Sequence, residues 1–270
     1  MLPTFDVLDL QPTEDPLRYR MTARPDLCTP FGFLYGGSGI AASVEAAERA
    51  TQRPLQWLTT QFIGVPKPGD VVDLAVVVAK EGKVTTQTQV FATVDGEPVL
   101  ASLCAHTARP DGDHAQFLTM PDVPLPDECD AMGEPFPGML QGTFFDHLDR
   151  RLAAGRLALD AIGNPQTGIS LWCRIPGRQI DTPAAQAFVA DIVPMAVCAA
   201  LGVMPGGTSI DNTIRVMDTA PTEWVLLELI AEGFNRSVGH GSVRLWSQEG
   251  RLMAVAQQTC IIRTPKRQGG

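Results

Sequence analysis

Positive charge is scarce in this sequence. Its 270 residues include 21 lysines and arginines against 30 aspartates and glutamates, which gives a formal net charge of −9. Proteins that bind nucleic acid need a basic surplus to neutralise phosphates, so this balance argues against a nucleic-acid partner. No acidic loop has the spacing of an EF-hand, so a calcium site of that kind is not expected either. The chain is 44% hydrophobic, enough to build a large core.

Motifs for metal binding, disulfide bonding and export are also lacking. The six cysteines form no CxxC pair and no Cys/His cluster at zinc spacing; they are Cys28, Cys104, Cys129, Cys173, Cys198 and Cys260. We therefore predict reduced core thiols and no metal site. The N-terminus carries acids where a signal peptide has basic residues, and no stretch reaches the roughly 20 apolar residues of a membrane span. These absences predict a cytoplasmic protein without a membrane partner.

No motif for a catalytic nucleophile is present. The sequence GGSG at 36–39 is followed by Ile40, where the hydrolase motif G-x-S-x-G requires glycine. The histidines have no serine or cysteine at a recognisable spacing, so we expect core or surface roles for all four; they are His106, His114, His147 and His240.

The chain has two halves of similar layout. The first has a strand at 19–23, a helix at 38–51 and strand-like runs at 55–65, 71–80, 84–94 and 99–108, separated by turn sequences such as KEGK and VDGEP. The second has a segment at 144–158, a strand at 168–175, a helix at 182–202 and strand-like runs at 209–216, 224–232, 237–247 and 252–263. Pro194 should kink or delimit the second helix. We predict an N-terminal domain at 1–110, a Pro/Asp-rich linker at 111–140 and a C-terminal domain at 141–270.

An internal repeat relates these halves. Ser38 and Asp191, the turn prolines Pro68 and Pro221, and the last-strand alanines Ala101 and Ala254 all lie 153 residues apart. A shared offset over a long stretch is the signature of duplication. The pattern alone predicts an α+β protein with two similar domains.

One acid stands out in the second half. Asp191 lies in the apolar run FVADIVP, and a buried carboxylate is costly unless it is paired, hydrogen-bonded or used in chemistry. Three explanations remain open at this point: an acid near a helix N-terminus, a buried structural acid, and a catalytic base.

The residues that follow carry a family resemblance. The acid in FVADIVP, the strand SIDNTI and the closing run QQTCIIR resemble the C-terminal half of the bacterial acyl-CoA thioesterase II (TesB-like) family, and FLYGGSGI resembles its F-G-G helix opening. The resemblance implies a double hotdog, in which each antiparallel sheet wraps a central helix. It also implies hydrolysis of an acyl-CoA by water, with no cofactor beyond the coenzyme A of the substrate, in a protein that forms homo-oligomers.

Carried over residue by residue, the resemblance gives a site. The catalytic acid falls on Asp191, the hydroxyl residue on Ser209 and the glutamine on Gln258. Separately, backbone N–H groups at a glycine-opened helix N-terminus could hold the thioester oxygen, so Gly36 and Gly37 are candidate oxyanion donors.

Departures from the family pattern leave alternatives open. Asn212 stands where the family usually has histidine, and Thr259 and Cys260 replace Glu and Gly after the glutamine. Asp211 is expected to be structural, with an arginine as a possible partner. An idle acyl-CoA-binding protein is one alternative function. A hotdog acyl-CoA hydratase or dehydratase is another, although such an enzyme would need an Asp/His pair and no histidine lies near Asp191 in the sequence.

Overall fold

The computed structural model describes residues 2–109, 114–204 and 206–263. In the first half the regular elements are β1 (Gln11–Pro12), β2 (Arg18–Thr22), α1 (Gly36–Thr51), β3 (Leu55–Phe62), β4 (Val71–Glu81), β5 (Thr85–Val94) and β6 (Glu97–Thr107). In the second half they are β7 (Asp149–Ala154), β8 (Gly168–Arg174), α2 (Pro183–Ala190), α3 (Val193–Leu201), β9 (Thr208–Val216), β10 (Trp224–Asn235), β11 (Val238–Ser247) and β12 (Leu252–Ile261). The predicted boundary between residues 110 and 111 lies outside the described residues.

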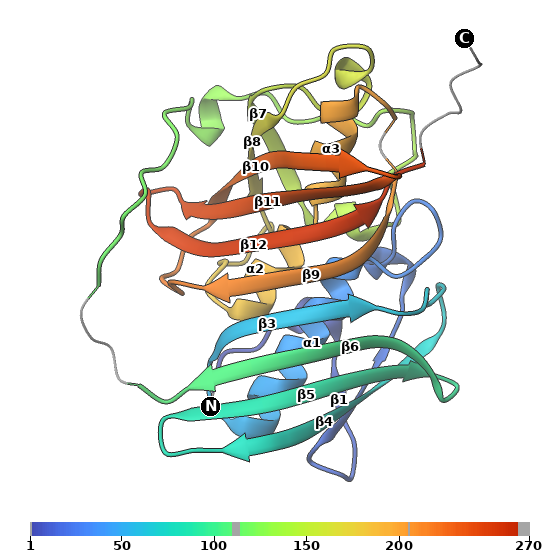
Figure 1. Ribbon diagram of the computed structural model, residues 1–270, viewed down its shortest axis with the longest axis vertical. Helices are drawn as coiled ribbons and strands as arrows, with labels where there is room; N and C mark the ends of the chain where they lie inside the picture. Colours follow the sequence, from blue (N-terminus) through green and yellow to red (C-terminus); the bar gives the residue numbers. More distant parts are fainter. Residues whose placement is uncertain (1, 110–113, 205, 264–270) are drawn as a thin grey trace.

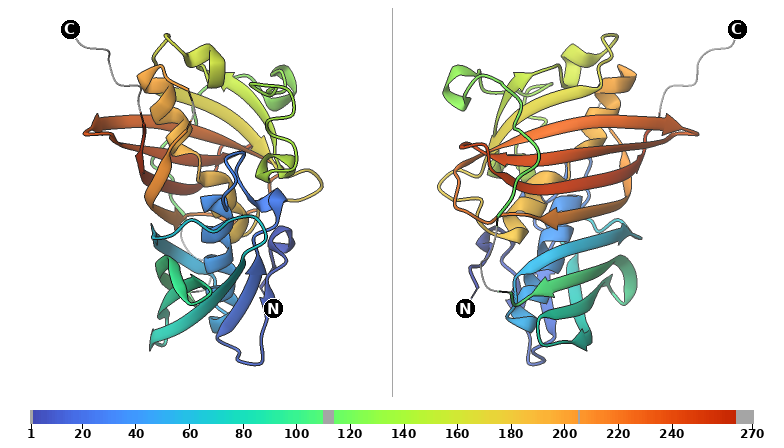
Figure 2. Two further views of the ribbon diagram at one scale, coloured as in Figure 1. Left: turned by 90° about the vertical axis from the view of Figure 1, so that its right-hand side faces the viewer. Right: turned by 60° about the vertical axis from the view of Figure 1, so that its left-hand side comes forward.

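All these strands belong to one curved antiparallel sheet. The strand order is β1-β2-β4-β5-β6-β3-β9-β12-β11-β10-β8-β7, so each half contributes a contiguous block. The blocks join edge to edge where β3 pairs with β9, and the helices lie on the concave side (Figures 1 and 2). The join removes two free strand edges that would otherwise be exposed. The predicted double hotdog is confirmed.

The sheet register supports the repeat and corrects one of its anchors. β5 and β11 start and end 153 residues apart, as predicted. In the next strands, however, the offset is one residue larger. Val90 of β5 pairs with Ser102 of β6, whereas its counterpart Val243 of β11 pairs with Ala256 of β12. The match of Ala101 with Ala254 is therefore wrong. A one-residue difference in the preceding turn shifts the last strand, so Ala254 corresponds to Leu100.

The second helix is broken. A helix was predicted over 182–202 with a kink or an end at Pro194, and α2 ends at Ala190 while α3 begins at Val193. Pro194 explains the break, because it has no N–H to continue the helix ladder and its ring clashes with the preceding turn. Asp191 and Ile192 connect the two helices with non-helical backbone, at φ −84°, ψ 50° and φ −126°, ψ 9°.

The same stretch corrects the expectation about long apolar runs. Pro183–Leu201, 19 residues with mean hydropathy 1.8, is long and apolar enough to cross a membrane by length and composition. In this structure 78% of its most apolar window is buried, against the sheet and α1. The core helix of a soluble protein passes the same test, so the composition of this stretch is weak evidence for a membrane span.

The Pro/Asp-rich segment before β7 lies on the outer face of the C-terminal sheet, where its green trace is visible in Figure 2. There it helps to cover a second apolar cluster, formed by Trp172, Trp224, Leu226 and Trp246. The indole N–H of Trp172 donates to the Pro124 carbonyl at 2.8 Å. The sequence predicted a linker here, and the described part of this segment also shields tryptophans from water.

Candidate active site

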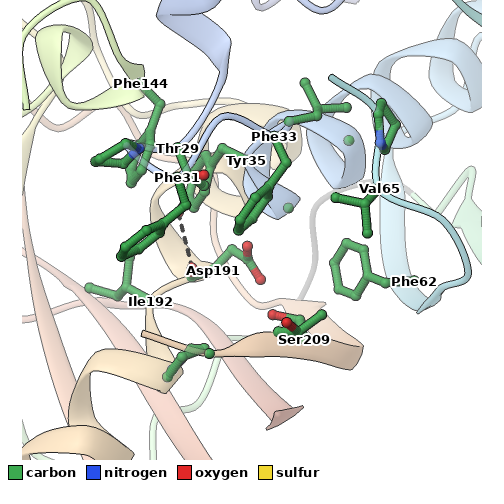
Figure 3. A pocket seen from close by; sticks show the side chains of 18 of the residues that line it. Thr29, Phe31, Phe33, Tyr35, Phe62, Val65, Phe144, Asp191, Ile192 and Ser209 are labelled. Atoms are coloured by element: carbon green, nitrogen blue, oxygen red, sulfur yellow. Dashed lines mark hydrogen bonds between the residues drawn. The ribbon is translucent and has the colours of Figure 1, made fainter. Parts of the chain in front are cut away.

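The break between α2 and α3 places Asp191 on the inner side of the fold, where its buried side chain lines a pocket. Tyr35, the residue before α1, fixes this break. Its hydroxyl donates to the Phe188 carbonyl at 2.9 Å, and to the Asp191 carbonyl at 3.2 Å (Figure 3). The Tyr35 ring is in turn stacked on Phe144, with centroids 3.7 Å apart. An element of the first half therefore sets the backbone position of the acid of the second half.

The carboxylate of Asp191 receives side-chain hydrogen bonds from two sheet residues. Asn212 Nδ2 donates to Oδ1 at 2.9 Å, and Gln258 Nε2 donates to the same oxygen at 2.6 Å. Gln258 Nε2 is also 2.6 Å from Ser209 Oγ. The three predicted catalytic residues thus lie together around one point, although they come from the α2–α3 break, β9 and β12.

Ser209 reaches this point because of a β-bulge. Asn212 pairs with Gln258 and Asp211 with Thr259, but Ser209 then pairs with Cys260, so Ile210 is the extra residue of β9. A bulge of this kind reverses which side of the sheet the next residue faces. Strict alternation from Asn212 would have placed Ser209 on the outer face, away from Asp191.

The glycine pair at the start of α1 allows this half of the site to close. A Cβ at Gly36 would fall inside contact distance of Asp191 Oδ2 and 3.0 Å from the Phe62 ring. The backbone N–H of Gly37 lies near the Asp191 carboxylate and helps to lower its pKa. Gly37 was predicted, together with Gly36, as an oxyanion donor; that role stays a prediction, and the Gly37 N–H also acts on the acid. Gly36 lines the pocket, so its N–H stays the candidate for that role.

Burial dominates the electrostatics of Asp191. The residue is 6% exposed, and desolvation raises its pKa from the ordinary 3.8 to about 7. The hydrogen bonds from Asn212, Gly37 and Gln258 favour the charged form and offset part of this rise. A carboxylate with a pKa near neutrality is suited to accept a proton in general base catalysis.

Asp191 and Ser209 lie in the wall of a deep, largely apolar pocket (Figure 3). One part of the pocket follows the small-residue face of α1 under the N-terminal sheet; it is lined by Gly36, Gly39, Ala42, Met21, Leu74 and Leu100. The other part extends beneath β7; it is lined by Met132, Leu140, Phe144, Phe145 and Arg150. Phe31 and Val65, both more than half exposed, border the pocket between these parts and solvent.

Two residues of the site were missed in the sequence. Asn212 was noted only as a departure from the family pattern, and Tyr35 was not singled out. Asp211 is structural, but its partner differs from the one expected: it accepts from the Thr259 backbone N–H at 2.8 Å, and within the described residues it forms no ion pair. This bond satisfies the backbone N–H of Thr259, which lies next to the β-bulge between β9 and β12.

Other candidate groups are placed away from the pocket. Of the histidines, His106 is bonded to Thr88, His147 to Asp26 and His240 to Thr259, and none of them lines the pocket. All six cysteines are free and five are buried, so the prediction of core thiols holds for all but the partly exposed Cys129. No cluster of three or more potential metal ligands occurs in the described part of the chain.

The fold and this pocket define the class of the protein, a double hotdog with an acid presented to an apolar cavity. A family model described as acyl-CoA thioesterase N-terminal domain matches residues 25–107, and one described as acyl-CoA thioesterase C-terminal domain matches residues 126–262. The chain belongs to the acyl-CoA thioesterase family, of the TesB-like type, and is a thioester hydrolase.

Solved structures share the whole architecture. A provisionally assigned thioesterase from Novosphingobium aromaticivorans is 29% identical with a TM-score of 0.84, over 94% of this chain and 98% of that one. The acyl-CoA thioesterase II TesB2 from Mycobacterium marinum is 18% identical with a TM-score of 0.73, over 97% and 98%. A hot dog fold protein of unknown function from Alicyclobacillus acidocaldarius is 21% identical with a TM-score of 0.82, over 95% and 96%. No curated protein matches the chain.

Proposed function

We propose that this protein hydrolyses an acyl-CoA to the free acid and coenzyme A by direct attack of a water molecule held by Asp191, Ser209 and Gln258. One observation carries the proposal: a buried carboxylate with a pKa of about 7 lies in the pocket wall, within hydrogen-bond reach of Gln258 and next to Ser209. These groups can accept a proton from one water molecule and orient its lone pair.

In the first step the water oxygen bonds to the thioester carbonyl carbon while one water proton passes to Asp191. The pair of π electrons moves onto the carbonyl oxygen and forms an oxyanion. The Gly36 N–H, at the positive end of α1, is the donor that we assign to this oxyanion.

In the second step the oxyanion collapses and the carbon–sulfur bond breaks. The electron pair leaves with the sulfur of coenzyme A, and Asp191 returns its proton to that sulfur. The products are the carboxylic acid and the thiol, and Asp191 is again a carboxylate. The atoms balance without a covalent enzyme intermediate, which agrees with the lack of a nucleophile motif.

A thioesterase assay over a series of acyl chain lengths tests the proposal on wild type, Asp191→Asn and the matched control Asp211→Asn. We expect turnover by the wild type, a loss of about 10²- to 10⁴-fold in Asp191→Asn and near-normal activity in the control. Equal activity in all three would remove Asp191 from the mechanism. Tight acyl-CoA binding without turnover would favour the idle binding protein. Hydration of an enoyl-CoA would favour the hydratase.

A further inference from the structure

The part of the pocket beneath β7 contains a cation that the proposed reaction does not use. Arg150 lies on β7 and pairs with Cys173, a core residue of the inner face, whereas Arg151 pairs with Trp172 of the outer cluster. The alternation of the strand therefore points Arg150 into the fold and Arg151 away from it. Of the residues that the structure describes, Arg150 and Asp191 are the two charged ones that line the pocket.

The Arg150 guanidinium has no polar partner among the described residues. It lies over the Phe145 ring, 4.2 Å from the centroid, and its Nε is buried without a hydrogen bond. The nearby acids are engaged elsewhere: Asp149 pairs with Arg174 at 3.0 Å, and Glu134 accepts from the Gly138 N–H.

Other arginines with a buried Nε differ in this respect. Arg49 pairs with Glu45, and Arg151 donates to the Pro126 carbonyl at 2.8 Å. Burial lowers the pKa of Arg150, but a guanidinium still remains charged at neutral pH. A charged donor whose Nε is buried without a partner is costly, and a planar guanidinium matches carboxylate and phosphate geometry.

We propose that Arg150 is a binding site for an oxyanion carried by the substrate. The inference rests on the proposed function, because the substrate that enters the pocket is taken to be an acyl-CoA. An acyl-CoA offers two such groups: a carboxylate at the distal end of a dicarboxylic acyl chain, and the phosphates of coenzyme A. The apolar surroundings, Met132, Leu140 and Phe145, favour the compact carboxylate over the more strongly hydrated phosphates.

The test compares thioesters that differ by one group. The substrates are octanoyl-CoA and octanedioyl-CoA, which adds a terminal carboxylate, and the N-acetylcysteamine thioesters of both acids, which have no phosphates. The variants are Arg150→Met, which keeps an apolar stem without charge, Arg150→Lys, which keeps the charge without the fork, and Arg151→Met as the matched control. Thermal melts establish that each variant is folded.

If Arg150 binds the distal carboxylate, Arg150→Met lowers the kcat/KM ratio of the dicarboxylic to the monocarboxylic substrate by about 10- to 100-fold, in both thioester series. Arg150→Lys restores part of this ratio, and Arg151→Met leaves it unchanged. If Arg150 binds a phosphate, both CoA esters lose equally and both N-acetylcysteamine esters are unaffected. Unchanged ratios within and between the series would overturn the inference.

Failure of the proposed function would be seen separately, as absence of turnover by the wild type on all four substrates. Arg150 is then judged by equilibrium binding of the two CoA esters to Asp191→Asn and to the double variant with Arg150→Met. A loss of affinity in the double variant supports the oxyanion site. Equal affinities of the two proteins for both esters contradict it.

Discussion

Asp191 should make stability and activity depend on pH in opposite ways, and replacing it by asparagine should remove both dependences. In the folded protein burial raises the pKa of this carboxyl to about 7, whereas an unfolded chain keeps the ordinary 3.8. Between these values the native state holds a proton that the unfolded state has already lost. The extra stability from this proton is full below about pH 4 and disappears as the pH rises through about 7.

The magnitude follows from the span between the two pKa values. Each pH unit within the span is worth about 1.4 kcal/mol, so ionising Asp191 costs the folded state about 4 kcal/mol in all. Asparagine does not titrate. The free energy of unfolding of Asp191→Asn, minus that of the wild type, should therefore increase from pH 4 to pH 8 by a few kcal/mol. Any loss or gain from the altered hydrogen bonds adds a constant and does not change this slope.

Urea denaturation of both proteins at several values between pH 4.5 and 8.5 measures the difference. Glu48→Gln is the matched control, because burial also raises the pKa of Glu48 to about 7, away from the pocket. Both substitutions should flatten the dependence of stability on pH. In the wild type kcat/KM should rise with pH to a plateau above about 7, and only the loss of Asp191 should remove this rise. A wild-type minus variant difference that is constant from pH 5 to 8 would refute the assigned pKa and its cause.

Three further substitutions test the supports of the acid. Asn212→Ala removes a donor to the charged form, so the pKa of Asp191 and the midpoint of the kcat/KM profile should rise by up to about one pH unit; an unshifted midpoint contradicts this. Tyr35→Phe leaves two buried carbonyls without their donor, which should cost about 1–3 kcal/mol in urea denaturation and lower kcat more than it raises KM. Gly36→Ala forces a methyl group against Asp191 Oδ2, and kcat should fall about 10²-fold in a protein with unchanged circular dichroism; wild-type kcat would contradict the close approach.

The sequence predicts the parts of the fold that depend on local patterns. Turn sequences and alternating apolar residues locate β5 and β11 to within one residue at each end, because half-buried antiparallel strands leave that pattern. Pro194 identifies the position where the second helix cannot continue. The repeat gives the two-part architecture, and the resemblance adds the double hotdog, which the pattern alone does not determine.

The features that complete the site depend on tertiary contacts. The bulge at Ile210 is a matter of register between β9 and β12, and simple alternation would place Ser209 on the wrong face. The use of the Gly37 N–H by Asp191 requires the N-terminus of α1 to lie against the end of α2, more than 150 residues further along the chain. In the sequence Arg150 is one of two consecutive arginines. Only the pairing of β7 with β8 shows that it faces the inside of the fold while Arg151 faces the outside.

The repeat also explains why one chain has one acidic centre. The register shift recurs in the first half, where Gln56 is the extra residue of β3, so Leu55 takes the position of Ser209. By the same pairing Leu58 corresponds to Asn212 and Cys104 to Gln258, and all three residues are buried in the core.

By the 153-residue offset of the predicted repeat, Ser38 corresponds to Asp191, and the Ser38 hydroxyl donates to the Leu27 carbonyl. The strand register that brings Ser209, Asn212 and Gln258 together is thus present twice, but hydroxyl and amide side chains occupy those three positions only in the second half. The first half instead supplies Tyr35 and the glycine pair to the acid of the second. Because each half gives what the other lacks, Ser38→Asp should bury a carboxylate where a hydroxyl now donates to the Leu27 carbonyl, and should destabilise the fold without creating a second active centre.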